Sequence, residues 1–188
     1  MTSGEKKLWG IHTMDDSLFL HDGVIAIGWR EMGDLARIGA TREAFKAYYI
    51  EKYPDAKKGS IATSSGMLFR FIHEVQIGDY VVFPSKSDRQ INLGVVEGAY
   101  CFAEDAERYV QQRKVKWLKH LPRTAFSQGA LYEIGSALTF FMVNNYADEF
   151  LAALESKGKK SFLPEDGEDE SVGATADDII ERISSSRN

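Results

Sequence analysis

The sequence predicts an α+β fold: a small mixed β-barrel of about six strands with helices at its periphery. The apolar residues gather in short runs bounded by turn residues, which is typical of strands. Strand patterns outnumber βαβ repeats, and this argues against a doubly wound sheet. The chain has 188 residues, of which 44% are hydrophobic, so it is long enough for one domain with a substantial core.

Two strands are predicted in the first part of the chain. Residues 8–13 indicate the first, and residues 18–23 follow as a short apolar run that ends in a His-Asp-Gly turn. Residues 24–27 are all apolar and too few for a helix, so we expect a buried strand there. That strand ends in a glycine and Trp29.

Two helices are predicted in the next part of the chain. Thr41 is placed to cap a helix over residues 42–53, where apolar side chains recur at helical spacing. Pro54 ends this helix. A second helix is predicted over residues 61–73, with Ser60 as its cap.

Strands return in the second half of the chain. A polar hairpin loop is expected at residues 85–90, and glycines in the strand that follows it suit a β-bulge or a sharp barrel bend. Helices are predicted over residues 126–134, ended by Gly135, and from Asn145 to about residue 156. The expected strands are residues 80–83, 91–98, 100–102, 114–118 and 138–143.

The acidity of the chain is concentrated towards residue 188. The formal net charge is −5, but residues 164–188 alone carry eight acids and two bases. Residues 1–163 carry 21 bases and 20 acids, a net charge of +1. We therefore expect a folded domain over residues 1–157 and an acidic linker or tail over residues 158–188. A link to a further domain and a natural tail both fit this composition.

Residue content disfavours several classes of protein. One cysteine, Cys101, excludes an intramolecular disulfide and a CxxC zinc site, and it fits a reducing, cytoplasmic location. No apolar run approaches the roughly 18 residues that span a bilayer. The histidines show no metal-ligand spacing, and neither a Gly-rich phosphate loop nor a nucleophile elbow is present. We predict a binding module with no catalytic residue, metal or cofactor.

Several motifs follow one another in a defined order. A strand ending in tryptophan covers residues 24–29, a Gly-Asp-hydrophobic segment covers residues 78–83, and its hairpin partner covers residues 92–98. A basic strand over residues 114–118 is followed by Leu-Pro. In this order the motifs resemble the PUA-like superfamily, and within it the EVE and YTH domains, over about residues 7–155.

The resemblance implies a function as well as a fold. Domains of this kind read modified bases in RNA or DNA, and in prokaryotes they often precede Mrr-like nuclease domains of modification-dependent restriction systems. The expected partner is therefore double-stranded DNA with a modified base, and a nuclease domain downstream would suit the acidic linker. The sequence departs from the family in the helical insertion at residues 41–73 and in lacking a tryptophan after Tyr100. A modified-RNA reader and a protein-interaction or assembly module remain as alternatives.

A flipped base needs flat walls that replace its lost stacking, and each aromatic wall contributes about 1–3 kcal/mol. Trp29 is the first candidate wall because it follows a buried strand next to polar residues. The strand positions of Trp9 and Trp117 favour the core for both, so Trp9 is only a remote candidate. The further candidates for the base pocket, ring walls first and then polar residues expected to converge on one rim, are Tyr100, Phe102, Tyr109, His12, Thr13, Arg30 and Ser85.

One segment of the folded part has a strongly asymmetric charge. No acid lies between Glu107 and Glu133, while six bases do. Phosphate contacts from such a segment would set affinity and make it depend on salt. A strand edge protected by lysines is the alternative. The candidate backbone contacts, with one more from the hairpin loop, are Arg89, Arg108, Arg113, Lys114, Lys116, Lys119 and Arg123.

Overall fold

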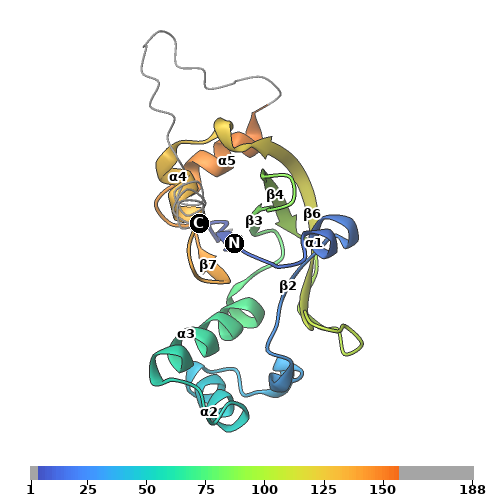
Figure 1. Cartoon of the computed structure of the whole chain (residues 1–188), viewed down its shortest axis with the longest axis vertical. Coiled ribbons are helices and arrows are strands. Elements are labelled where there is room, and N and C mark those ends of the chain that lie inside the picture. Colours follow the sequence, from blue (N-terminus) through green and yellow to red (C-terminus); the bar gives the residue numbers. More distant parts are fainter. Residues whose placement is uncertain (1–3, 157–188) are drawn as a thin grey trace, which may run out of the picture.

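The computed structural model describes residues 4–156, so the predicted acidic segment at 158–188 lies outside the described residues (Figure 1). The strands are β1 (Leu8–Ile11), β2 (Val24–Ile27), β3 (Tyr80–Pro84), β4 (Gln90–Val96), β5 (Cys101–Phe102), β6 (Gln111–Pro122) and β7 (Phe140–Met142). The α-helices are α1 (Asp16–Asp22), α2 (Arg42–Lys52), α3 (Lys58–Phe69), α4 (Gln128–Ile134) and α5 (Ala147–Glu155). Shorter helical turns are η1 (Arg30–Met32), η2 (Leu35–Arg37), η3 (Arg70–Glu74) and η4 (Arg123–Ala125).

The strands form one mixed sheet. Its order is β2-β6-β4-β3-β1-β7, and β5 pairs with β6 beside this path. β1 and β3 are parallel, whereas the other pairs are antiparallel. The sheet curls into a half-barrel with helices around it, which confirms an α+β, barrel-like fold.

The two faces of the sheet bury separate hydrophobic clusters. Trp9 and Val81 belong to the larger cluster, with residues of α1, α2 and α3, whereas their neighbours Leu8 and Val82 belong to the smaller one. Residues of α4 and α5 complete the smaller cluster. Alternate residues of a strand face opposite sides of a sheet, so the helices cover both of its faces.

β6 is the long strand that pairs with three others. Its first residues pair with β2 and β5, and its later residues pair with β4. The register between β4 and β6 shifts at Gly94, where a side-chain Cβ would lie 2.7–2.8 Å from atoms of Val115, Lys116 and Trp117. Only a glycine permits this close approach. The extra residue is Leu118 of β6, so the predicted glycine lies opposite the irregularity and the bulge is not in β4 itself.

Local sequence signals account for most of the helices. Thr41 caps α2 by accepting a hydrogen bond from the Ala44 amide, as predicted. The second helix begins at Lys58, and from Arg70 its last turn is π-helical. α4 ends at Gly135 as predicted.

Three predictions of local structure were wrong. Ser60 does not cap the second helix, because α3 begins before it with Lys57 at the N-cap position. The apolar run and turn at residues 18–23 are the helix α1, because Asp15 caps it through the Leu18 amide and Gly23 ends it with φ +66°. Asn145 does not cap α5; its own amide instead donates to the Glu133 carboxylate, 2.9 Å away. The pattern missed α1 because one side-chain contact caps it, and it missed the start of α5 because Glu133, on α4, accepts the amides of Asn144, Asn145 and Tyr146.

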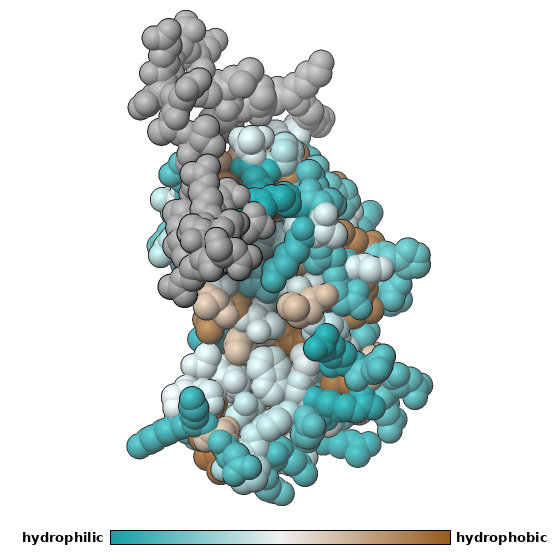
Figure 2. Space-filling view, viewed as in Figure 1, coloured by the Kyte–Doolittle hydropathy of each residue, from teal (hydrophilic) through white to brown (hydrophobic). Residues whose placement is uncertain are grey.

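Hydrophilic side chains cover much of the face shown in Figure 2, and the hydrophobic areas between them are small. No helix within residues 4–156 is long and apolar enough to cross a membrane.

Candidate nucleic-acid interface

The strand register brings five chain segments together at one edge of the sheet. β1 and β3 are parallel, so the residues that follow them, His12 and Ser85, lie at the same edge. Antiparallel pairing places the start of β4 and the end of β6 there too, because Gln90 lies opposite Pro122. β7 starts at this edge as well, and the His12 amide donates to the Thr139 carbonyl over 2.9 Å.

These segments surround a cavity of about 490 Å³, which we call the hairpin pocket because the β3–β4 hairpin loop forms one side. Pockets of about 300–1,000 Å³ are typical of small-molecule sites. The pocket is lined by His12, Pro84, Ser85, Lys86, Arg89, Arg123, Leu131, Ile134, Gly135, Ser136, Ala137, Leu138 and Thr139.

The hairpin pocket combines a basic side and an apolar side. Lys86, Arg89 and Arg123 supply positive charge, and the described lining residues include no carboxylate. Leu131, Ile134 and Leu138, among others, supply an apolar wall. A site of this composition favours a ligand that has both a flat or apolar part and an anionic part.

Buried polar side chains fix the hairpin loop. Asn92 is fully buried, and its amide nitrogen donates to the Phe83 carbonyl at 2.9 Å and to the Ser85 hydroxyl at 3.0 Å. Its side-chain oxygen lies 2.5 Å from Nδ1 of His120. Ser85 in turn donates to Asp88, and this hydrogen bond lowers the pKa of the Asp88 carboxyl. The loop therefore presents its bases from a pre-organised frame.

Arg89 closes the same loop with φ +58°, in the left-handed region that non-glycine residues seldom adopt. The strain costs on the order of 1 kcal/mol or more. A glycine would adopt this conformation without strain.

Trp29 lies at the other end of β6. Trp29 comes shortly after Ile27, which pairs with Gln111, the first residue of β6. Arg123, by contrast, follows Pro122, the last residue of β6. Figure 1 accordingly shows α2 and α3 below the sheet and α4 and α5 at its upper end. We call the region around Trp29, Arg30, residues 33–35, Tyr100 and Gln111 the tryptophan corner. The expectation that Arg30 converges with His12 and Ser85 was wrong, because β2 pairs with the far end of β6.

Trp29 has an unusual backbone and an ordinary environment. Its φ is +59°, an outlier for so bulky a residue, and its carbonyl accepts from the Met32 amide at 3.0 Å. The ring is partly buried and packs against the larger hydrophobic cluster. Arg30 donates to the carbonyls of Ala106, at 2.5 Å, and Glu104, at 3.2 Å. A role for Trp29 as a base wall stays a prediction.

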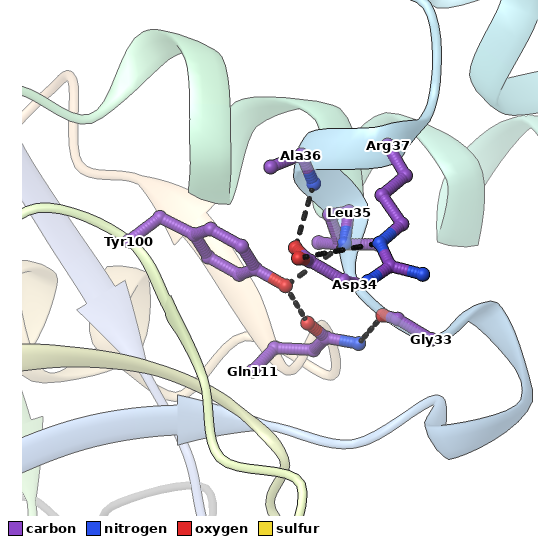
Figure 3. Close-up of polar contacts among 7 residues, drawn as sticks. All are labelled: Gly33, Asp34, Leu35, Ala36, Arg37, Tyr100 and Gln111. Atoms are coloured by element: carbon purple, nitrogen blue, oxygen red, sulfur yellow. Dashed lines mark hydrogen bonds and ion pairs between the residues drawn. The ribbon is translucent and has the colours of Figure 1, made fainter.

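The polar groups of the tryptophan corner satisfy one another (Figure 3). The Tyr100 hydroxyl accepts from the Leu35 amide at 2.9 Å and donates to the side-chain oxygen of Gln111. The Gln111 amide nitrogen donates to the Gly33 carbonyl at 2.9 Å. Burial raises the pKa of the Tyr100 phenol well above its ordinary value, so the group stays protonated. This network ties the chain around η2 to β6, which is a structural role.

The other predicted base-pocket residues do not line the hairpin pocket. Trp9 is fully buried, stacks on Phe140 with 5.0 Å between the ring centroids, and donates to Asp79, so it is a core residue. Thr13 is buried and accepts from the Asp15 amide. Tyr109 accepts from the Met14 amide, and Phe102 is half-buried in β5.

Two of the predicted phosphate contacts serve the fold. Arg113 is 4% exposed, and its guanidinium donates to the carbonyls of Gly98, Phe71 and Val75. Burial lowers the pKa of Arg113, yet a guanidinium keeps its charge in proteins. Lys119 donates to carbonyls at the end of α5, where a cation also complements the helix dipole. Arg113 is therefore unavailable to a phosphate, whereas Lys119 is half-buried and held against backbone carbonyls.

The remaining predicted phosphate contacts are accessible. Arg108, Lys114, Lys116 and Arg89 are exposed, and Arg123 is half-buried where it lines the hairpin pocket beside Arg89. Sequence analysis missed Lys86 and the apolar wall of α4, because the wall comes from a helix more than forty residues away along the chain. The polar hairpin loop was the available signal for Lys86. Within residues 4–156, no group of three or more His, Cys, Asp or Glu is placed to hold a metal ion.

Comparison with protein families places the chain in one of them. The family model for the Domain of unknown function (DUF8426) matches residues 12–139. This chain belongs to that family. The match covers His12, the hairpin loop and Arg123, and it also covers the tryptophan corner. No curated protein and no solved structure matches the chain.

Proposed function

We propose that this DUF8426 domain binds double-stranded DNA and holds one modified nucleotide, turned out of the duplex, in the hairpin pocket. The observation that carries the proposal is a cavity of about 490 Å³ with three cationic side chains, one imidazole and an apolar wall. An enzyme or reader that examines a base outside the duplex holds it between aromatic or apolar side chains and contacts its edge with polar groups.

The two sides of the pocket suit the two parts of a nucleotide. The base would lie against Leu131, Ile134 and Leu138, and the phosphates on either side of it would face Lys86, Arg89 and Arg123. Charge-assisted hydrogen bonds from arginine to phosphate are among the stronger polar contacts in proteins. The rigid hairpin frame adds affinity because little order is lost when the nucleotide enters.

The charge of the surrounding surface supports a nucleic-acid partner. Lys114 and Lys116 are exposed on β6, the strand whose last residue precedes Arg123. Bases arranged in this way can follow a duplex backbone beside the pocket. The resemblance to EVE and YTH domains supports the modified base, and a targeting role in a modification-dependent restriction system is part of the proposal.

The test is a set of binding titrations with duplexes of one sequence. One duplex carries no mark, and the others carry 5-methylcytosine or N6-methyladenine at one position. We expect one marked duplex to bind at least about tenfold more tightly, a difference of about 1.4 kcal/mol. Arg89→Ala and Arg123→Ala should each weaken that binding. Arg37→Ala, an exposed arginine beside the tryptophan corner, is the control with the same change of charge.

Equal affinity for all duplexes, with no effect of the pocket variants, would rule the proposal out. Matched single-stranded RNA and DNA belong in the same experiment, because preference for RNA would assign the pocket to a modified-RNA reader. Self-association without oligonucleotide binding would favour the assembly module.

A further inference from the structure

Met14 is an apolar side chain that is 75% exposed, and it lines a hollow that shares Lys86 with the hairpin pocket. It lies in the short connection between β1 and α1, two residues after the pocket residue His12. If a duplex is bound at the hairpin pocket, its stacked bases are the apolar surface that an exposed methionine so close to Lys86 would meet.

The backbone around Met14 is held in place. The Met14 amide donates to the Tyr109 hydroxyl at 2.9 Å, and the Asp15 amide donates to the Thr13 hydroxyl at 3.0 Å. Asp15 also caps α1 by accepting from the Leu18 amide at 3.1 Å. The exposed side chain therefore projects from a fixed base rather than from a loose loop.

A further contact joins this connection to the hairpin loop. Asp16 accepts a hydrogen bond from the Ser87 amide at 2.7 Å, and Lys86 lines both the hairpin pocket and a shallow hollow that Met14 shares. Met14 therefore lies in a hollow that adjoins the hairpin pocket through Lys86, and it also borders a second hollow with Arg108 and Tyr109. Of the acids in the hollows that Met14 lines, Asp15 and Asp16 accept backbone amides, and Glu107 lies beside Arg108.

We infer that Met14 is the wedge that enters the base stack of the duplex and fills the gap left by the nucleotide in the hairpin pocket. The inference rests on the proposed function. Proteins that bend or open DNA insert apolar side chains, methionine among them, between base steps. A methionine side chain is unbranched and polarizable, so it can fit the irregular space between two bases. Met14 is a positioning residue, because it holds the duplex open while other residues hold the nucleotide.

The test compares two duplexes that carry the same preferred mark, one fully paired and one with a mismatch at the marked position. A mismatched base costs less to turn out, so a wedge matters less for it. We expect Met14→Ala to weaken binding of the paired duplex about tenfold and binding of the mismatched duplex clearly less. Met14→Leu should restore most of the affinity. Ile77→Ala is the control, because Ile77 is 57% exposed and precedes β3 at the opposite end of that strand from the pocket.

The second readout is a fluorescent adenine analogue next to the mark, whose emission rises when it loses its stacking. Wild-type protein should raise the emission, and Met14→Ala should raise it less at saturating concentration. An unchanged affinity, or an equal loss for both duplexes, would overturn the wedge while leaving the proposed function intact. Failure of the wild-type protein to prefer any marked duplex would overturn the proposed function itself, and the wedge with it.

Discussion

The two ends of β6 differ in where their polar groups are directed. At the tryptophan corner, Tyr100, Gln111 and Arg30 make hydrogen bonds to the chain's own backbone and to each other. At the hairpin pocket, buried Asn92 and Ser85 fix a loop whose bases border a cavity. The comparison teaches that a conspicuous residue such as Trp29 does not by itself mark a binding site. A site also needs space with charges beside it, and the hairpin pocket combines a cavity of about 490 Å³ with three bases and no carboxylate among its described lining residues.

The largest expected effect lies near the tryptophan corner. Arg113→Ala removes three hydrogen bonds to buried carbonyls, so we expect the free energy of unfolding to fall by about 3 kcal/mol or more. Urea denaturation measures this loss. DNA affinity per folded molecule should stay the same. A loss below about 1 kcal/mol, or weaker binding by the folded fraction, would break the distinction between the two regions.

The double variant Arg89→Ala/Arg123→Ala tests the hairpin pocket in the opposite way. We expect DNA affinity to fall by about a hundredfold, roughly 2.7 kcal/mol, while stability changes by less than about 0.5 kcal/mol. The slope of log affinity against log salt should become shallower by nearly two units, because two phosphate contacts are lost. An unchanged salt slope would show that neither arginine faces a phosphate.

Tyr100→Phe sharpens the structural role of the tryptophan corner. Without the hydroxyl, the Leu35 amide and the Gln111 side chain lose a partner, and we expect about 1–2 kcal/mol of destabilisation. Tyr132→Phe is the matched control, since Tyr132 is 77% exposed and its loss of a hydroxyl should change little. Both variants should bind DNA as the wild type does, and weaker binding by Tyr100→Phe alone would assign the corner to the interface.

Arg89→Gly separates function from stability at a single position. Relief of the φ of +58° should stabilise the protein by up to about 1 kcal/mol, because glycine adopts this conformation freely. Loss of the cation should weaken DNA binding about tenfold, the same effect that we expect of Arg89→Ala. Thermal denaturation and the binding titration are measured on the same sample. A stabilised variant with full affinity would contradict the role of Arg89 in binding.

The smallest effect depends on pH. The hydrogen bond from Ser85 lowers the pKa of Asp88, so its carboxylate stabilises the fold above the ordinary carboxyl pKa of about 4. This contribution is lost as the pH falls through the lowered value. Asp88→Asn should therefore be slightly less stable than wild type at pH 7, and the difference should shrink towards pH 3. A difference that stays constant over this range would contradict the contact between Ser85 and Asp88.

Sequence patterns predicted the elements of the fold better than their arrangement. Strands and helices with strong periodicity, such as the helix capped by Thr41, lie close to their predicted positions. The predicted convergence of His12 and Ser85 is also confirmed, because each directly follows a strand and the two strands are parallel. Arg30 follows a strand in the same way, yet it lies elsewhere because β2 pairs with the first residues of β6. Strand pairing between distant segments is not visible in local sequence.

Burial likewise decides the role of the basic segment. Arg113 and Lys116 have similar surroundings in the sequence, but one guanidinium is buried against three carbonyls and the other side chain is exposed. Alternation along β6 explains the difference, since residues of opposite parity face opposite sides of the sheet. The sequence showed the alternation without showing which face would be covered.

The most direct test of the central claim is an amide chemical-shift titration of the ¹⁵N-labelled protein with the preferred marked duplex. It follows both regions in one experiment, through the amides of His12, Lys86 and Thr139 and through the amides of Gly33 and Tyr100 with the indole of Trp29. We predict that the signals of the hairpin pocket shift and saturate with the duplex, while those of the tryptophan corner stay in place. Shifts centred on Trp29 and Tyr100, with the hairpin pocket unchanged, would contradict the account.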